Sequence, residues 1–263
     1  MRRLFLKGLL QDEVTITGDD AAHLMYAMRA KAGDEVTLVD DHGAVGCMKL
    51  TGFTADSVTM KLVERIDANT ESPLSLVLAQ CLLKGDKFDW VIQKAVELGA
   101  VAVQPIASRN CVVRYEGKKA VAKQQRWQKI AEEAAKQCGR TRVPEVYSVT
   151  AITEWIGNLK KTSCATLSAP SGHLPQRGRQ DASLLFCYEN EEQQPIKTAL
   201  RTLSDDVRNI SVLIGPEGGF TLDEAAAIQA AGGQPVTLGP RILRAETAAI
   251  AAMSIVQYEK GDL

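Results

Sequence analysis

Two glycine-bearing segments near the C-terminus have the composition of ligand-binding loops. The first, Leu213-Ile-Gly-Pro-Glu-Gly-Gly-Phe220, follows an apolar, β-like run at 210–214. The second, Leu238-Gly-Pro-Arg-Ile-Leu-Arg-Ala-Glu-Thr-Ala-Ala-Ile-Ala-Ala252, joins a short apolar run to a long stretch of small residues. Glycine lets the backbone approach a ligand closely, and α/β proteins bind ligands where parallel strands end. The two loops therefore predict one shared pocket at the ends of parallel strands.

The sequence lacks the motifs of several well-known ligand sites, and this narrows the choice of ligand. The chain contains no Gly-x-x-x-x-Gly-Lys-Ser/Thr sequence, which the phosphate-cradling P-loop requires, and no Gly-x-Ser-x-Gly elbow. It also contains no Gly-x-Gly pair, which removes the dinucleotide fingerprint and the glycine loop of Rossmann-like methyltransferases. Glu217 is unfavourable beside phosphates and favours a cationic or zwitterionic small molecule. The alternative is that the glycines only build a turn before a helix that Thr221 and Glu224 open as a capping box.

The chain divides into two parts with different sequence patterns. In residues 1–70, short β-prone runs separated by glycines indicate a small barrel or sandwich, with one helix from Asp19 or Asp20 to Arg29. The polar stretch 67–73 is typical of a linker. From residue 74, strands alternate with helices, as in a parallel α/β sheet. The strands are expected at 14–17, 35–39, 45–50 and 57–63, then at 74–80, 101–105, 145–149, 162–167, 183–188, 210–214 and 236–238, with helices at 86–98 and 119–138.

Charge is distributed unevenly along a chain of 263 residues whose net charge is only −1. Residues 109–142 contain ten Lys and Arg against three Asp and Glu, a local charge of +7. A basic region on a nearly neutral protein fits a phosphate-binding face. A solvated helix face without a partner would explain the same residues.

Composition also sets limits on metal sites, membranes and compartment. The six cysteines lie at least 23 residues apart and the three histidines show no ligand spacing, so neither a metal site nor a redox dithiol is expected. Scattered thiols fit a reducing compartment. Lys7 interrupts any signal-peptide core, and no apolar run reaches the roughly 20 residues of a membrane span. We expect a cytoplasmic protein without a metal and without a membrane segment.

Over nearly its whole length the chain resembles the bacterial 16S ribosomal RNA (uracil-N3)-methyltransferases of the SPOUT superfamily. The two glycine-bearing segments carry the resemblance most strongly. Ser108-Arg109-Asn110 departs from the Ser/Thr-Glu-Arg that is usual in the family, which weakens any role for Arg109. Further matching stretches are His23-Leu24 to Arg29, Gly33-Asp34, Lys84-Gly-Asp-Lys87, Gln93-Lys-Ala-Val-Glu-Leu-Gly99, Arg126-Trp-Gln-Lys-Ile130 and Glu133-Ala-Ala-Lys-Gln-Cys-Gly-Arg140.

The resemblance implies a fold and its partners. Residues 1–70 would form a PUA-like β-barrel that helps to hold RNA, and residues 74–263 an α/β SPOUT domain with a trefoil knot that binds S-adenosylmethionine. The enzymes of the family are homodimers. A stripe of small residues is compatible with a dimer, although close packing within one subunit would explain it equally well. The stripe consists of Ala245, Ala248, Ala249, Ala252 and Ile255.

The resemblance also assigns the two loops to two walls of the cofactor site. The end of the strand at Tyr188-Glu189 would supply a third wall. Backbone groups of the second loop would read the adenine edge. The implied cofactor-binding residues are Gly215, Pro216, Glu217, Gly218 and Gly219 on one side, with Leu238, Gly239, Ile242, Leu243 and Thr247 on the other.

The implied reaction transfers a methyl group from a sulfonium to uracil N3, which must lose its proton. Positioning and stabilisation of the charge on the uracil would be the main contributions of the protein. Arg244 is the candidate for charge stabilisation, because a guanidinium does not act as a base. The base stays open among Glu217, Glu246 and water. An Arg244–Glu246 ion pair that only braces the loop is the alternative role.

The implied RNA partner is 16S ribosomal RNA in the decoding region of the small subunit. Lys and Arg contacts to phosphates supply most of the nonspecific affinity for such a partner. Two other functions remain open: methylation of another RNA position or of a ribose 2′-OH, and RNA binding without catalysis. The candidate RNA-binding residues are Arg2, Arg3, Lys123, Arg126, Lys129 and Arg140.

Overall fold

We describe the protein from a computed structural model, which places residues 3–162 and 182–263. These residues form two compact units, Met1–Glu71 with Glu132–Val143, and Ser72–Ala131 with Pro144–Leu263. The division expected from the sequence did not include the second segment of the first unit. Arg2 and all but the first residue of the strand expected at 162–167 lie outside the described residues.

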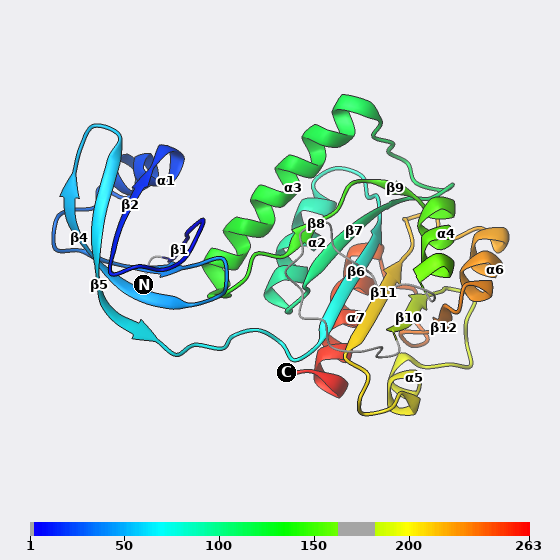
Figure 1. Cartoon of the computed structure of the whole chain (residues 1–263). Coiled ribbons are helices and arrows are strands. Elements are labelled where there is room, and N and C mark those ends of the chain that lie inside the picture. The colour runs from blue at the N-terminus through cyan, green and yellow to red at the C-terminus, as the bar shows by residue number, and fades with distance from the viewer. Residues whose placement is uncertain (1–2, 163–181) are drawn as a thin grey trace. The chain divides into compact units, whose positions relative to one another are not determined.

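The first unit is built on a curled five-stranded sheet (Figure 1). Its strand order is β1-β3-β4-β5-β2, antiparallel throughout except that β1 runs parallel to β3. Four of the five strands were expected. The missed strand, β1, has only three residues, too few for an alternating pattern. The strands are β1 (Arg3–Phe5), β2 (Glu13–Thr17), β3 (Glu35–Val39), β4 (Val45–Phe53) and β5 (Ser57–Ile66).

The helix expected after β2 is present but begins earlier and changes type. It starts as α1 (Gly18–Ala22), with Thr17 rather than Asp19 or Asp20 at the N-cap position. It continues as a π-helical segment, η1 (His23–Ala27). Asp19 and Asp20 lie instead in the first turn, where their charges interact favourably with the helix dipole. The apolar pattern predicted the helix, but the acidic residues placed its N-cap two or three residues too late in the sequence.

An ion pair between the buried Arg140 and the half-buried Glu71 joins the segment after β5 to residues 140–142 in the first unit. The Glu71 carboxylate accepts hydrogen bonds from the Arg140 guanidinium and from the backbone N–H groups of Thr141 at 2.9 Å and Arg142 at 3.1 Å. Burial alone would raise the pKa of Glu71, but Arg140 and these N–H groups hold it below its ordinary value. Stretch 67–73, expected as a linker, therefore ends in a buried contact.

Two predicted RNA contacts take part in this internal network. Arg140 is only 4% exposed and its guanidinium is occupied by Glu71. Arg3 donates hydrogen bonds to the carbonyl oxygens of Gly139 and Arg140. The structure therefore corrects the prediction for Arg140, which is a buried cation paired with Glu71 and not part of the charged surface. The guanidinium of Arg3 is likewise engaged with the chain itself.

The second unit is an all-parallel sheet. Its strand order is β12-β10-β11-β6-β7-β8, and β9 also pairs with β7 beyond β8. The strands expected at 74–80, 101–105, 183–188 and 210–214 are confirmed within two residues. Of the strand expected at 145–149, only residues 145 and 146 form a strand, and a further two-residue strand follows at 150–151. The strand expected at 236–238 lies two residues earlier. The strands are β6 (Ser75–Cys81), β7 (Ala102–Ala107), β8 (Glu145–Val146), β9 (Thr150–Ala151), β10 (Ala182–Cys187), β11 (Asn209–Ile214) and β12 (Gln234–Val236).

Helices cover both faces of this sheet (Figure 1). Right-handed crossovers put helices on one face when the chain moves across the sheet in one direction and on the other face when it moves back. α2 and α5 accordingly share a face and both contact α7, whereas α6 contacts α4. Within the described residues, no helix is long and apolar enough to cross a membrane. The helices are α2 (Lys87–Glu97), α3 (Gly117–Cys138), α4 (Ile152–Thr162), α5 (Ile196–Thr202), α6 (Leu222–Ala230) and α7 (Ala245–Lys260).

The parallel strands end at one edge of the sheet, and the predicted site residues follow those ends. The first glycine loop comes directly after β11 and the second after β12. The segments after β6, β7 and β10 reach the same edge. The sheet thus brings together loops that are up to about 160 residues apart in the sequence.

The buried Glu71–Arg140 pair makes a stability prediction. We expect Glu71→Ala to lower the free energy of unfolding by about 3 kcal/mol, because it leaves a buried guanidinium without its carboxylate. Chemical denaturation followed by circular dichroism measures the change. Glu64→Ala, which removes an exposed carboxylate of β5, is the control and should change the value by less than about 0.5 kcal/mol.

The same pair has a defined pH dependence. A carboxyl whose pKa is lowered in the folded state stabilises the fold above its unfolded-state pKa, and the contribution is lost as pH falls through the lowered value. The difference between wild type and Glu71→Ala should therefore shrink between pH 7 and about pH 3. An equal difference at both pH values would contradict this role for Glu71.

Candidate functional site

Side chains from two segments fix the C-terminal end of the first glycine loop. On one side Thr221 caps α6 as expected: its Oγ accepts from the Glu224 N–H at 3.2 Å, and Glu224 accepts from the Thr221 N–H at 2.9 Å. On the other side Asn110, after β7, donates from Nδ2 to the carbonyl oxygens of Gly218 and Gly219, both at 3.1 Å. The capping box was readable from the sequence. The bonds from Asn110 cross 108 and 109 residues and were not.

Gly219 lies against the segment that follows β10. Its φ of +66° is in the left-handed region, which side chains other than glycine rarely adopt. A Cβ placed on Gly219 would lie 1.8 Å from Oε1 of Glu189. The glycine therefore allows two loops of the strand edge to touch, and it brings Tyr188-Glu189 beside the first loop, where the third wall was expected.

The second loop connects β12 to α7 and ends at Arg244. Arg244 is the N-cap residue of α7 but makes no side-chain capping bond. Its guanidinium is exposed and forms no ion pair with any described residue, so the bracing pair with Glu246 is not formed. Ile242, expected in a wall of the cofactor site, is 89% exposed.

Lys87 joins the two predicted catalytic carboxylates, and sequence reasoning did not single it out. Its Nζ lies 3.3 Å from Oε1 of Glu217 in the first loop and 3.4 Å from Oε1 of Glu246 in the first turn of α7. Glu217 also accepts from the backbone N–H of Lys84 at 3.3 Å. The one available signal was Lys84-Gly-Asp-Lys87, a basic turn at the start of a helix that follows a strand.

Two buried polar atoms at this edge have no hydrogen-bond partner among the described residues. They are Oε2 of Glu246 and Oε1 of Gln80, a fully buried side chain near the end of β6. An unpaired buried oxygen is costly, and it commonly marks a place where a bound group completes the bonding. The charges of Lys87, Glu217 and Glu246 sum to −1. With its net negative charge and its acceptor oxygens, this cluster suits a small cation or zwitterion better than an anion.

A scan of family models matches the RNA methyltransferase domain to residues 70–257. The chain belongs to this RNA methyltransferase family. Across 267 aligned residues it is 32% identical to ribosomal RNA small subunit methyltransferase E of Bacillus subtilis (strain 168), with 98% of this chain and 97% of the relative covered. The resemblance inferred from the motifs is confirmed.

Solved structures of similar proteins share the fold of this methyltransferase over its full length. One is ribosomal RNA small subunit methyltransferase E from Neisseria gonorrhoeae bound to S-adenosyl methionine, with a TM-score of 0.82, 30% identity and coverage of 100% of this chain and 99% of that one. Another is a Legionella pneumophila protein named as a methyltransferase in complex with the bound cofactor SAM. Its TM-score is 0.82 at 26% identity, with 99% and 98% covered. The second unit is thus a SPOUT-like parallel-sheet domain, and the first a separate, curled antiparallel sheet.

The small-residue stripe of this methyltransferase is buried within the chain itself. α7 packs on β6 and β11 and contacts α2 and α5. Four alanines of the stripe are at most 9% exposed, and two of them are fully buried. Of the two explanations left open by the sequence, close packing within one subunit accounts for these alanines. They are Ala245, Ala248, Ala249 and Ala252.

The structure brings two of the scattered cysteines into contact. Cys81 ends β6 and Cys111 follows β7. A hydrogen bond from the Cys81 thiol lowers the pKa of Cys111 to about 6, with help from Ser108, while burial raises the pKa of Cys81 well above its ordinary value. Their separation of 30 residues in the sequence concealed this contact. Among the described residues, no group of three or more His, Cys, Asp or Glu side chains could hold a metal ion.

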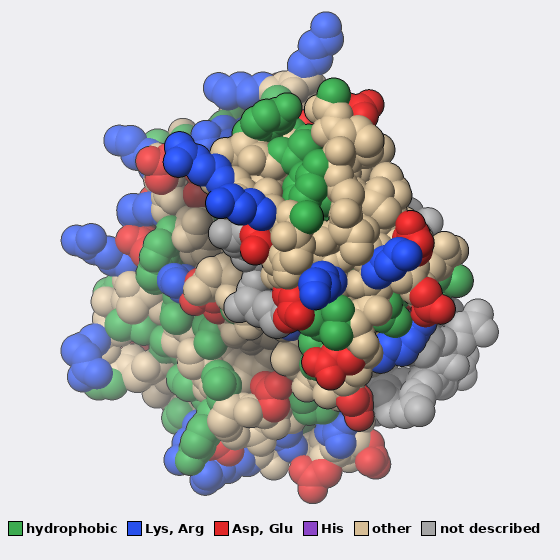
Figure 2. Space-filling view, turned by 90° about the vertical axis from the view of Figure 1, so that its left-hand side faces the viewer, with side chains coloured by type: hydrophobic (Ala, Val, Ile, Leu, Met, Phe, Trp, Pro, Cys, Tyr) green, Lys and Arg blue, Asp and Glu red, His purple; other side chains and the backbone are tan. Residues whose placement is uncertain are grey.

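The basic residues expected on α3 differ in how free they are. Arg126 pairs with Asp89, which also accepts from the Trp127 indole at 3.0 Å. Lys123 lies 5.3 Å from the centre of the Tyr115 ring, and Lys129 is exposed. Figure 2 shows Lys and Arg side chains standing out along the left edge of the view, with acidic side chains more frequent in its lower part. Basic surface is therefore available on this methyltransferase, although Arg126 is partly committed to Asp89.

Gly219 makes a prediction that separates backbone strain from steric conflict. We expect Gly219→Ala to destabilise the protein by more than Gly232→Ala, and thermal unfolding measures both. Both glycines have positive φ, of +66° and +89°, so both variants carry a strain of about 1–2 kcal/mol. Only Gly219→Ala also pushes Glu189 away, since no atom lies within 4 Å of a Cβ on Gly232. Equal losses in the two variants would refute the contact with Glu189.

Proposed function

We propose that this chain is an S-adenosylmethionine-dependent methyltransferase that modifies N3 of a uridine in 16S ribosomal RNA of the small subunit. The observation that carries the proposal is the meeting of the first glycine loop, the start of α7 and Lys87 at one sheet edge, in a chain of the RNA methyltransferase family. The names of the similar proteins support the substrate and the cofactor. We place the enzyme in the cytoplasm, without a metal or a membrane segment.

The residues at the sheet edge fit S-adenosylmethionine. The glycine loop lets backbone come close to a ligand, and the surplus negative charge of Glu217 and Glu246 over Lys87 complements a sulfonium. The unpaired Oε1 of Gln80 offers an acceptor for a ligand's donor. Gly215, Pro216, Gly218, Leu238, Gly239, Leu243 and Thr247 complete the proposed walls. The bound group would supply the methyl that is transferred.

Arg244 is the residue that we propose to act on the uracil. It stands at the start of α7, two residues before Glu246, and its guanidinium is exposed and forms no ion pair with any described residue. A fixed positive charge lowers the energy of the anion that forms when N3 loses its proton, by interacting with uracil O2 or O4. A guanidinium is a hydrogen-bond donor without an acceptor atom, so a different group must accept that proton.

We propose Glu246 as the base. One of its carboxylate oxygens is held by Lys87 and the other has no partner among the described residues. Glu217 is engaged by Lys87 and by the Lys84 N–H, which suits it to positioning the loop and facing the sulfonium. Lys87 would then bridge the two carboxylates and fix their orientation.

The finer features of the fold belong to the same proposal. The first unit would be a PUA-like RNA-binding domain, about residues 1–70, and residues 74–263 the SPOUT domain with a trefoil knot. The return of the chain from the edge strand β12 to pack α7 on the central strands supports a knot. The exposed side chain of Ile242 supports a homodimer, because a second subunit would cover it. Analytical ultracentrifugation decides the oligomeric state.

The decisive experiment is mass spectrometry of the nucleosides of 16S RNA from a strain that lacks this gene. We expect N3-methyluridine to disappear and to return when the wild-type chain is supplied. Loss of a ribose-methylated nucleoside instead would show that the enzyme acts on a 2′-OH. An unchanged nucleoside profile would favour an RNA-binding factor without catalysis.

Arg244→Ala tests the proposed mechanism. We expect turnover to fall at least about tenfold, because the charge on the uracil loses its stabilisation. Affinity for S-adenosylmethionine, measured by calorimetry, should stay within about twofold, because the guanidinium acts on the other substrate. Lys197→Ala, which removes an exposed cation of α5, should behave as wild type. Lost cofactor binding or full activity in Arg244→Ala would overturn the assignment.

A further inference from the structure

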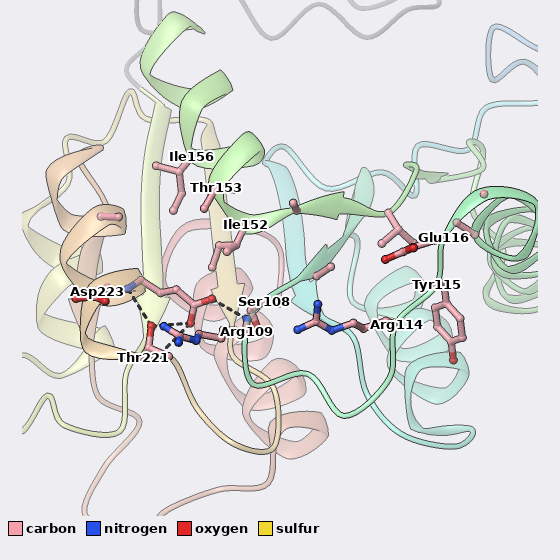
Figure 3. A pocket seen from close by; sticks show the side chains of 17 residues that line it. Ser108, Arg109, Arg114, Tyr115, Glu116, Ile152, Thr153, Ile156, Thr221 and Asp223 are labelled. Atoms are coloured by element: carbon pink, nitrogen blue, oxygen red, sulfur yellow. Dashed lines mark hydrogen bonds between the residues drawn. The ribbon is translucent and has the colours of Figure 1, made fainter.

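A cavity lies in the second unit, beside the carboxyl end of β7 (Figure 3). Its walls come from Ser108 and Arg109 after β7, from residues 114–120 at the start of α3, from the junction of β9 with α4, and from the first turns of α6. We call this cavity the β7 groove. Its volume of about 870 Å³ falls within the range of about 300–1,000 Å³ that is usual for ligand sites. None of the residues predicted to bind the cofactor lines this groove.

The β7 groove contains two guanidinium groups without a partner. Neither the Arg109 nor the Arg114 side chain forms an ion pair or hydrogen bond with any described residue. Figure 3 shows both inside the groove, with the Arg114 guanidinium turned toward the Ser108 side. Three carboxylates line the groove as well, those of Glu116, Asp223 and Glu224. Glu224 is buried, and its carboxylate accepts hydrogen bonds from the backbone N–H groups of Arg109 at 2.8 Å and of Thr221 at 2.9 Å.

Two further cations, Lys119 and Lys123, lie beside the groove on α3. Nζ of Lys119 lies 5.5 Å and Nζ of Lys123 5.3 Å from the centre of the Tyr115 ring, which lines the groove. The opposite wall is apolar, formed by the buried side chains of Ile152 and Ile156. Cations along one side bind successive phosphates, and an apolar wall with an aromatic ring accepts planar bases. The groove therefore has the chemistry of a site for single-stranded nucleic acid.

One segment of the chain contacts both the β7 groove and the first glycine loop. Arg109 and Asn110 are consecutive residues of one segment: the first binds Glu224 of α6 through its N–H, and the second binds the carbonyl oxygens of Gly218 and Gly219. A strand lying in the groove would thus rest on the segment that also fixes the first loop.

We propose that the β7 groove holds a single-stranded segment of the substrate RNA next to the target nucleotide, with Arg109 and Arg114 on its phosphates. The inference rests on the proposed function and adds a subsite to it. A strand of RNA fits better than a single anion, because the cations are spread from Arg109 to Lys123 instead of converging on one point. In this role Arg109 and Arg114 are positioning residues, which place the uridine without touching the reacting atoms.

The test compares the double variant Arg109→Ala/Arg114→Ala with wild type in binding a 16S ribosomal RNA transcript, by fluorescence anisotropy over a series of KCl concentrations. We expect affinity to fall about tenfold and the slope of log affinity against log salt to decrease by about two, one for each lost phosphate contact. Affinity for S-adenosylmethionine should be unchanged. Arg109→Lys/Arg114→Lys should restore the salt slope, and Lys197→Ala on α5 should bind as wild type.

Several outcomes would overturn the inference. One is that the double variant has the RNA affinity and the salt slope of wild type. Another is that the double variant loses binding of inorganic phosphate but keeps full RNA affinity. A third is that only the sedimentation of the double variant changes, which would assign the groove to a second copy of the chain. Circular dichroism of each variant shows whether it is folded. If wild type binds RNA but produces no N3-methyluridine, the proposed function fails while the comparison of salt slopes still decides the role of the groove.

Discussion

The close packing of α7 against the central strands fixes the geometry of the whole site. Alanines at the buried positions let the helix backbone approach β6 and β11, where larger side chains would hold it away. That approach puts the start of α7, with Arg244 and Glu246, at the edge where the parallel strands end. Lys87 then links this start to the first glycine loop through two carboxylates. The loops alone, without the helix beneath them, would not form a site.

The sequence predicted those parts of the fold that short-range chemistry determines. The capping box of Thr221 and Glu224 was readable because its partners are three residues apart. The parallel sheet followed from the alternation of apolar strands and helices. The π-helical segment after α1 and the three-residue strand β1 were not readable, since neither has a periodic pattern of its own. The positions of the two glycine loops at one sheet edge followed from the parallel arrangement.

The contacts that build the site were beyond sequence reasoning because they join distant residues. Nothing in the pattern around Lys87 says that its ammonium meets Glu217 and Glu246, 130 and 159 positions later. Asn110 donates hydrogen bonds to the carbonyl oxygens of Gly218 and Gly219, 108 and 109 positions later. Arg140 shows the opposite error. Counting charge along residues 109–142 treated every cation as exposed, whereas this one is neutralised inside the first unit.

The same return of α7 has a consequence for how the chain folds. Gln257 of α7 accepts a hydrogen bond from Ser72, 185 residues earlier, and donates one to the carbonyl oxygen of Leu98, 159 residues earlier. Contacts across such separations form late and slowly, because the entropy of closing a long loop must be overcome first. The methyltransferase therefore acquires its site only once α7 has packed against strands formed by much earlier segments of the chain.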